Sequence, residues 1–306
     1  MGIYLEKTEE LPEIPEALRR MIGTDDHALL RFMDDEVYDD EAKGYSVYKL
    51  VTGDRAFVLK KSESAEDFRD EVKHYSLLKG LPVPEFLGSA DGFILLSFVE
   101  GADLKKPTDD GIRAFAKSLT AIMNAYPMGR DHERGRYDVY LKRLEKRAAF
   151  ISCKPELSSA FSVFLERQRE IPLTLSNGDL LPINALYDGE KAVIIDWEFG
   201  GFMPYSLDIA RFFAHGRVSG KASPFRMTDE QKRLFVDLVY GGLTVKPPRA
   251  VFDRDVLLAE FNEYVEILEY YFRETTAERG ETFRDYYPRA KELAALIISR
   301  EGTHRR

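Results

Sequence analysis

The first third of the chain carries aliphatic and aromatic residues at the two-residue spacing that is typical of β-strands. This spacing predicts strands at Ala28–Met33, Tyr45–Thr52 and Ala56–Lys60, preceded by a short helix from about Pro15 to Met21. Thr52-Gly53-Asp54-Arg55 joins the last two strands and has the composition of a hairpin turn. The chain is therefore predicted to begin mainly with strands.

The spacing becomes helical after this segment and then returns to that of a strand. Apolar residues lie on one helix face from residue 65 onward, at Phe68, Val72, Tyr75, Leu78 and Leu81. The prolines at 82 and 84 end this helix, because the residue before a proline is driven toward extended backbone. Ala90-Asp91-Gly92 then predicts a turn into an apolar strand at Phe93–Val99, and the apolar pattern breaks at residues 100–103.

The remainder of the chain is predicted to be mostly helical. Thr108 and the two aspartates after it can cap a helix that runs to about Tyr126. Strand-like sequence interrupts the helices only at Leu173–Asp196. The other predicted helices are Tyr137–Ser152, Pro155–Glu170, Thr228–Tyr240, Asp253–Thr275 and Pro288–Arg300.

Length and composition exclude several classes of protein. A chain of 306 residues is long enough for two domains or two lobes, and its 44% apolar residues are ample for a buried core. The net charge of −9 disfavours a nucleic-acid-binding protein, and no apolar stretch approaches the ~20 residues of a membrane span. The single cysteine, Cys153, cannot form an internal disulfide. With no signal sequence visible, we expect a soluble cytoplasmic protein.

Residues 173–198 carry the strongest indication of chemistry. Asp188-Gly189 predicts a hairpin, and its return strand brings Asp196 back beside the loop that holds Asp179 and Asn184. Their oxygen atoms are the ligands that Mg²⁺ prefers, and a carboxylate free of metal can accept a proton from a hydroxyl. A single aspartate near glycine or proline is more often a turn residue. The joint pattern favours a site, since a buried Val-Ile-Ile run ends in a charge.

The segment 177–184, Asn-Gly-Asp-Leu-Leu-Pro-Ile-Asn, followed by Asp196-Trp-Glu, resembles the catalytic core of the aminoglycoside phosphotransferase and choline kinase-like family. The resemblance implies an α+β, protein-kinase-like fold with a small antiparallel-sheet N-terminal lobe and a large, mostly helical C-terminal lobe. It also implies that Asp179 is the catalytic base, that Asn184 and Asp196 are magnesium ligands, and that Asp208 supports the catalytic loop.

The N-terminal lobe fits the same family. Phe57-Val-Leu-Lys60 resembles the strand with the phosphate-binding lysine, and Glu71 lies where the family has that lysine's ion-pair partner. Taken alone, such a lysine or glutamate is more often a surface charge. Leu96–Gly101 resembles the hinge, where backbone groups of Ser97, Phe98 and Val99 would contact the nucleotide base. We therefore expect an N-terminal nucleotide-binding lobe at 1–96, a hinge at 97–101 and a helical lobe at 102–306.

Two departures from the family pattern keep a second function open. Asn177 replaces the usual histidine, and no Gly-x-Gly-x-x-Gly loop is present, with Lys43–Ser46 the only candidate phosphate cover. These departures would also fit a catalytically weak or inactive pseudokinase that acts as a nucleotide-binding module. Asp-Trp-Glu in place of Asp-Phe-Gly argues against a protein kinase.

The acceptor is expected to bind to the helical lobe. Glutamates recur every third residue at 260, 263, 266 and 269, and a cationic acceptor could use such a face. Residues three apart spread around a helix, however, so a solvated face is the favoured interpretation. A solvated loop is likewise favoured for the basic residues Arg211, Arg217, Lys221 and Arg226.

The combined prediction is a small-molecule phosphotransferase. With Mg²⁺, it would move the γ-phosphoryl group of ATP or GTP to a hydroxyl of an aminoglycoside-like or other small acceptor. A choline-, ethanolamine- or sugar-kinase-like enzyme remains an alternative, since the fold does not select the acceptor.

Overall fold

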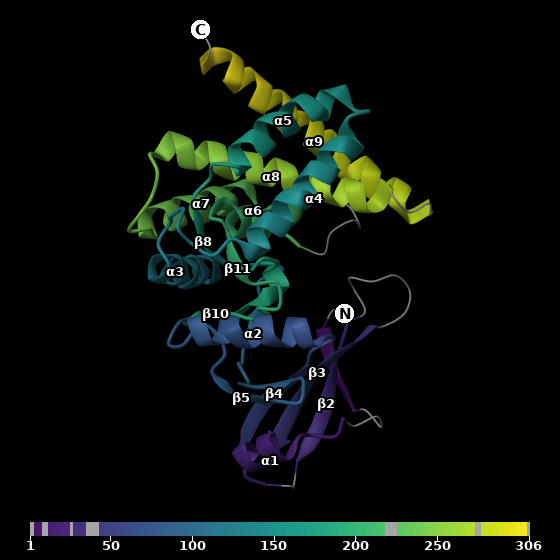
Figure 1. The fold of residues 1–306 in the computed structure, drawn as a ribbon, viewed down its shortest axis with the longest axis vertical. Coiled ribbons are helices and arrows are strands. Elements are labelled where there is room, and N and C mark those ends of the chain that lie inside the picture. The colour runs from purple at the N-terminus through teal and green to yellow at the C-terminus, as the bar shows by residue number, and fades with distance from the viewer. Residues whose placement is uncertain are drawn as a thin grey trace.

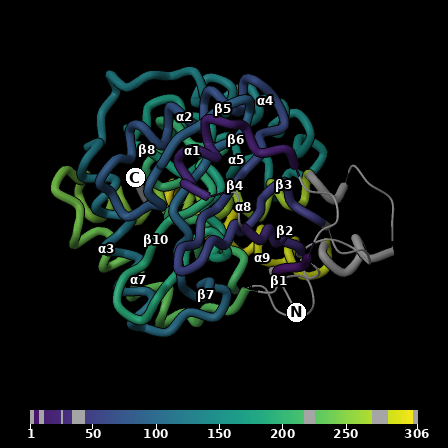
Figure 2. The backbone as a smooth tube through the Cα atoms, turned by 90° about the horizontal axis from the view of Figure 1, so that it is seen from below, coloured from purple at the N-terminus to yellow at the C-terminus, as the bar shows by residue number. Residues whose placement is uncertain are grey.

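The computed structural model describes residues 3–7, 12–24, 27–34, 43–217, 225–272 and 277–304. A sheet-rich part and a helix-rich part are stacked along the long axis of the molecule, with helix α2 (Ala65–Leu77) between them (Figure 1). Viewed from the sheet end, the strands overlie the helices of the second part instead of lying beside them (Figure 2). Within these ranges, no helix combines the length and the hydropathy needed to cross a membrane.

A six-stranded antiparallel sheet forms most of the N-terminal part. Thr52 pairs with Arg55 at the tight turn, which confirms the predicted hairpin. In sheet order the strands are β1 (Ile3–Lys7), β2 (Ala28–Asp34), β3 (Lys43–Thr52), β4 (Arg55–Lys61), β6 (Phe93–Ser97) and β5 (Phe86–Ala90).

Strand β4 shows how this sheet sorts its side chains. Phe57 and Leu59 are buried on the face that packs against α1 (Glu16–Ile22), in a core with Leu18. Side chains alternate along a strand, so Lys60 points to the other face, toward α2. Ser64 begins α2 by accepting a hydrogen bond from the Asp67 N–H. The alternation thus directs Lys60 toward the interior of the molecule.

The C-terminal part is built mainly from helices, as predicted. Thr108 caps the first of them through a hydrogen bond from the Gly111 N–H. The helices are α3 (Asp109–Ala125), α4 (Gly135–Ile151), α5 (Pro155–Gln168), α6 (Ser206–Ala214), α7 (Asp229–Gly242), α8 (Arg249–Phe272) and α9 (Ala277–His304). Two small sheets accompany them, one of β7 (Ala102–Asp103), β9 (Ala185–Tyr187) and β10 (Ala192–Ile194), the other of β8 (Leu173–Ser176) and β11 (Gly201–Pro204).

Some elements differ from the sequence prediction. Helix α6 and strands β1, β5 and β11 were not predicted, and α9 continues through Pro288 instead of beginning there. Almost every side chain of α6 is buried, including that of the polar Asp208, so this helix does not present the solvent-exposed polar face of a surface helix. Pro288 removes one helical hydrogen bond, but the surrounding turns pack Tyr286 and Ala290 into a core with α8.

One hydrophobic core crosses from the N-terminal part into the helices. Leu78, Ile94 and Leu96 pack in the same buried cluster as Phe115 and Trp197. The two parts are therefore joined by continuous packing as well as by the chain itself. A separate core holds α4, α5, α8 and α9 together.

Asp255 on α8 anchors a buried polar contact in the helical part. The Asp255 carboxylate is fully buried, and it accepts hydrogen bonds from Arg167 Nε and Nη2, both at 2.7 Å, and from the Tyr205 hydroxyl at 2.6 Å. All three donors therefore depend on one side chain.

We expect Asp255→Ala to lower the free energy of unfolding by about 3 kcal/mol, because it leaves buried donors without a partner. Urea unfolding followed by circular dichroism measures the loss. Asp253 on the same helix makes an ion pair with Arg249 in which both side chains are at least 40% exposed, so Asp253→Ala should cost less than about 1 kcal/mol. Equal losses for the two variants would contradict the assignment.

Candidate functional site

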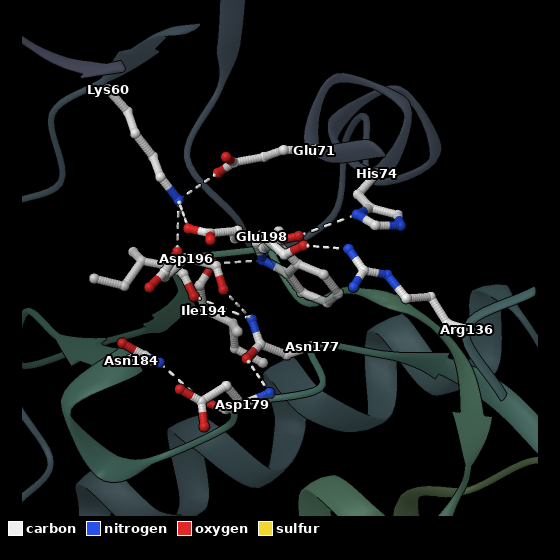
Figure 3. Close-up of polar contacts among 12 residues, drawn as sticks. Lys60, Glu71, His74, Arg136, Asn177, Asp179, Asn184, Ile194, Asp196 and Glu198 are labelled. Atoms are coloured by element: carbon white, nitrogen blue, oxygen red, sulfur yellow. Dashed lines mark hydrogen bonds and ion pairs between the residues drawn. The ribbon is translucent and has the colours of Figure 1, made fainter. Parts of the chain in front are cut away.

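Lys60 brings together three carboxylates from two distant parts of the chain (Figure 3). Its Nζ atom lies 3.0 Å from Glu71 Oε1 on α2, 2.8 Å from Asp196 Oδ1 and 3.1 Å from Glu198 Oε2. Lys60 and Glu71 are both buried. The sequence predicted the first pair, and the structure places Asp196 and Glu198 on the same ammonium group.

The charges in this cluster depend on one another. Burial by itself would lower the pKa of Lys60, but the negative charges of Asp196, Glu71 and Glu198 outweigh it and raise that pKa well above its ordinary value. Lys60 is therefore charged. Burial raises the pKa of Glu71 to about 7, against the opposing effect of Lys60. Among the described residues, Glu71 Oε2 has no hydrogen-bond partner, and Lys60 contacts the carboxylate at Oε1.

The loop after β8 is fixed by hydrogen bonds to the Asp208 side chain on α6. The buried Asp208 carboxylate accepts hydrogen bonds from the Ser176 hydroxyl and from the backbone N–H groups of Asn177 and Gly178, at 2.7 to 3.2 Å. Burial raises its pKa to about 6, although these donors oppose the shift. Gly178 has φ of +81°, and a Cβ there would lie 2.2 Å from the Phe199 carbonyl oxygen. The loop therefore requires glycine directly before Asp179.

Asn177 connects this loop to the Asp196 segment. Its Nδ2 donates to the carbonyl oxygens of Ile195, at 3.1 Å, and Asp196, at 2.7 Å, and its Oδ1 accepts from the Asp179 N–H at 3.3 Å. The asparagine that replaces the family's histidine thus links the two segments through hydrogen bonds at both the nitrogen and the oxygen of its amide.

The β9–β10 hairpin brings the remaining residues together, as predicted. Ile195 N–H donates to the Asn184 carbonyl oxygen at 2.9 Å, and Asn184 Nδ2 donates to the Asp179 carbonyl oxygen at 2.8 Å. Asp196 follows with φ of +57°, a left-handed conformation that is costly for a residue with a Cβ. Such strain is characteristic of functional sites, where it aims a side chain in a required direction.

Asn184 and Asp196 have the chemistry to bind Mg²⁺. The Asn184 Nδ2 donates to the Asp179 carbonyl oxygen, and this hydrogen bond fixes the orientation of the amide. The Asn184 Oδ1 then points away from that carbonyl and can bind a metal ion. The Asp196 side chain is 44% exposed and offers its second carboxylate oxygen. Across the described ranges, no group of three or more His, Cys, Asp and Glu side chains has metal-binding geometry. Two hard oxygen ligands fit a magnesium ion that also takes phosphate oxygens.

The predicted hinge has few free backbone donors. The N–H of Ser97 donates to the Glu85 carbonyl oxygen at 2.9 Å, and that of Phe98 donates to the Ala56 carbonyl oxygen at 3.3 Å. The N–H of Val99 has no backbone partner within the described residues. Among the donors of 97–99, Val99 is therefore the one available to a ligand.

A cavity of about 310 Å³ opens beside Asp179. Its wall is partly apolar, with Tyr140, Met203 and Leu207, and the 45% exposed Phe199 adds a further apolar surface. Charged side chains from three helices complete the lining, namely Arg136, Arg143, Arg147, Arg211, Glu263 and Glu266. The cavity can therefore accommodate a small molecule with both apolar and polar groups next to the Asp179 carboxylate.

The interpretation of the α8 glutamates as a solvated face is wrong. Glu260 and Glu263 are buried, and Glu269 is 12% exposed at its side chain. Each of the four acids makes an ion pair: Glu260 with Lys232, Glu263 with Arg211, and Glu266 and Glu269 with Arg147. Charge pairing made burial possible, and sequence spacing does not reveal such partners.

Arg211 was also wrongly interpreted as part of a solvated loop. It lies in α6 with its side chain 19% exposed, and its guanidinium contacts Asp179 and Glu263. The side chain of Arg217 and the whole of Lys221 lie outside the described residues.

Sequence reasoning assigned no role to two further contacts. Glu198 reaches Lys60, and His74 Nδ1 lies 3.0 Å from the Trp197 carbonyl oxygen (Figure 3). Burial lowers the pKa of His74, so the neutral ring donates to that carbonyl. Asp-Trp-Glu itself was the only available signal for Glu198, whereas nothing in the sequence around His74 indicates a contact 123 residues away.

The chain has similarity to curated proteins over about half of its length. It is 26% identical over 163 residues to protein LicA of Haemophilus influenzae strain KW20/Rd, a match that covers 52% of this chain and 57% of that protein. A second Haemophilus influenzae protein LicA matches over the same length, which is 45% of that protein. The chain thus spans about half the length of the curated relatives that it matches.

Solved structures with the same fold cover nearly the whole chain. A putative aminoglycoside phosphotransferase from Ralstonia eutropha JMP134 has a TM-score of 0.61 at 12% identity, over 93% of this chain and 97% of that one. Choline kinase from Cryptosporidium parvum Iowa II has a TM-score of 0.56 at 11% identity, over 94% and 92%. These likenesses establish the expected kinase-like α+β fold.

The sequence profile of the phosphotransferase enzyme family matches residues 42–235, from the third strand of the sheet into α7. The match includes Lys60, Glu71, Asp179, Asn184 and Asp196, the residues that the fold gathers around one site. The chain belongs to the phosphotransferase enzyme family.

Proposed function

We propose that this protein is a Mg²⁺-dependent phosphotransferase that moves the γ-phosphoryl group of ATP or GTP to a hydroxyl of a small molecule. The observation that carries the proposal is the Lys60 cluster, in which a buried ammonium contacts Glu71 and Asp196 within one site. Phosphoryl transfer depends on positioning and charge stabilisation, and this cluster suits both.

Lys60 binds the phosphates of the nucleotide in this proposal. Glu71 holds the ammonium from α2, so that the charge has a fixed place when phosphate oxygens arrive. Asn184 and Asp196 hold Mg²⁺, which supplies positive charge to the phosphate oxygens when bound. Asp196 and Glu198 contact Lys60 directly in the structure, and anionic phosphates would compete with them for the ammonium.

Asp179 orients the acceptor hydroxyl and accepts its proton as the oxygen attacks phosphorus. Its side chain is 28% exposed and borders the cavity, which gives a small molecule access to the carboxylate. The nearby loop is fixed by Asp208 and Asn177, so the carboxylate keeps its position relative to the metal ligands.

The nucleotide base is proposed to lie at residues 97–101, between an N-terminal lobe at 1–96 and a C-terminal lobe at 102–306. The free N–H of Val99 supports a backbone contact there, whereas the N–H groups of Ser97 and Phe98 already have partners. We therefore assign to the Val99 N–H the hydrogen bond to the nucleotide base. Ser97 and Phe98 would contact the base through groups other than their N–H.

The acceptor is proposed to occupy the cavity beside Asp179. Solved structures with this fold include a putative aminoglycoside phosphotransferase and a choline kinase, and their names refer to aminoglycosides and to choline. Glu263 and Glu266 in the cavity wall are already paired with arginines. The cavity therefore offers a cationic acceptor less unpaired negative charge than the row of glutamates in the sequence indicates. An acceptor panel should therefore include neutral sugars as well as aminoglycosides, choline and ethanolamine.

The acceptor panel, combined with a nucleotide-binding assay, distinguishes the phosphotransferase from the pseudokinase alternative. Binding of Mg-ATP or Mg-GTP in a thermal-shift assay, with no transfer to any acceptor, would favour a nucleotide-binding module. Asn177 supports the active alternative, because it holds the Asp179 and Asp196 segments together through its amide. The protein is proposed to work in the cytoplasm, where both nucleotides are available.

We expect Asp179→Asn to lower kcat by at least ~10²-fold, because an amide cannot accept the hydroxyl proton. Nucleotide affinity should stay within about threefold, since Asp179 is not a proposed metal ligand. Coupled measurement of nucleoside diphosphate release gives the rate. Asp188→Asn is the control, because Asp188 is an exposed residue in the turn of the β9–β10 hairpin and should keep full activity. An active Asp179→Asn protein would remove the residue from this role.

We expect Asp196→Ala to weaken binding of the Mg²⁺–nucleotide complex by at least ~10-fold, because one of two protein ligands to the metal is lost. Isothermal titration calorimetry with Mg²⁺ measures the affinity, and a parallel titration in EDTA provides the control. The affinity difference between wild type and variant should disappear in EDTA. An equal loss with and without the metal would argue against the assignment.

A further inference from the structure

The catalytic loop carries no positive charge of its own. Residues 177–184 read Asn-Gly-Asp-Leu-Leu-Pro-Ile-Asn, so neither lysine nor arginine within the loop can reach Asp179. The cation comes instead from α6, which begins only two residues after β11. Arg211 Nε lies 2.7 Å from Asp179 Oδ1, and Nη2 of the same guanidinium approaches the same oxygen.

This contact makes the two oxygens of the Asp179 carboxylate differ in their hydrogen bonding. Oδ1 accepts a hydrogen bond from Arg211 Nε and makes an ion-pair contact with Nη2, while Oδ2 has no hydrogen-bond partner within the described part of the chain. Asp179, Arg211 and Gly178 all line the cavity. A carboxylate held by one oxygen has a defined rotation, so its other oxygen has a defined direction.

Arg211 is itself held on its far side. Its Nη1 donates to Glu263 Oε2 on α8 at 2.8 Å, and the Glu263 side chain is fully buried. Burial opposes the charge of Glu263, but Arg211 and His215 outweigh it and hold its pKa below the ordinary value. Both ends of the guanidinium are thus fixed by carboxylates, and a long flexible side chain becomes a rigid connection.

We propose that Arg211 is the positioning residue for Asp179, with Glu263 as the anchor that keeps it in place. Arg211 binds one oxygen of the carboxylate so that the other faces the acceptor hydroxyl in the cavity. This inference rests on the proposed phosphotransferase function. The connection runs from α8 through α6 to the catalytic loop, so the helical part fixes the geometry of the proton acceptor.

The test compares Arg211→Met and Arg211→Lys in the full-length protein. Arg211→Met should lower kcat by about 10- to 100-fold, since misplacement of a reacting group by about an ångström has an effect of this size. The Michaelis constant for the nucleotide should change less than threefold. Arg211→Lys keeps the charge but loses the planar fork, so it should restore only part of kcat.

Arg167→Met is the matched control. Arg167 also binds a fully buried carboxylate on α8, that of Asp255, but it makes no hydrogen bond or ion pair with the catalytic loop within the described residues. Arg167→Met should lower the melting temperature and leave kcat unchanged below that temperature. A loss of kcat that is equal in the two methionine variants would make Arg211 a merely structural residue and overturn the proposal.

A double-mutant cycle identifies the residue through which Arg211 acts. In an Asp179→Asn background, Arg211→Met should have no more than a twofold further effect on the residual rate. An undiminished effect in that background would overturn the proposal.

The melting temperatures of the same four proteins provide a readout that needs no reaction. The loss in the double variant should be smaller than the sum of the two single losses, because both variants break the same contact. If the wild-type protein transfers no phosphate to any acceptor, the proposed function fails. Non-additive melting temperatures would then locate the failure in the reaction, and additive ones would overturn the contact as well.

Discussion

The buried ammonium of Lys60 is the constraint on which the rest of the site depends. A charge removed from water requires partners, and here they include Glu71 of α2 and Asp196, which are 125 residues apart in the sequence. Satisfying Lys60 therefore requires that the sheet, α2 and the β9–β10 hairpin adopt their relative positions. His74 supports the same arrangement by donating to the Trp197 carbonyl oxygen. The candidate site and the interface between the two parts of the molecule are stabilised by the same contacts.

Much of this arrangement could be predicted from the sequence because local rules determine it. Strand alternation gave the direction of Lys60, and the turn at Asp188-Gly189 gave the return of Asp196 toward Asn184. The family motif then supplied roles for residues that individually have ordinary structural explanations. These predictions share one property, which is that each depends on residues close together in the chain or on a pattern already known.

The errors share the opposite property. The α8 glutamates and Arg211 have the composition of a solvated surface, and only the fold reveals that each has an oppositely charged partner from another helix. A charged residue becomes an interior residue when a partner from another element neutralises it, and that partner is invisible in the local sequence. Helix α6 was missed for a related reason, because its polar residues Asp208 and Arg211 are kept in the interior by partners from other elements.

The hydrophobic core that spans both parts has a consequence for the protein as a whole. Ile94 and Leu96 of the sheet share one packed cluster with Phe115 and Phe212 of the helical part, so separating the parts would expose apolar surface on both. Two lobes with independent cores could melt one after the other. Here the loss of either lobe removes part of the other's interior, which favours a single cooperative unfolding unit. Movement of one part against the other is then limited to small displacements that keep this shared cluster packed.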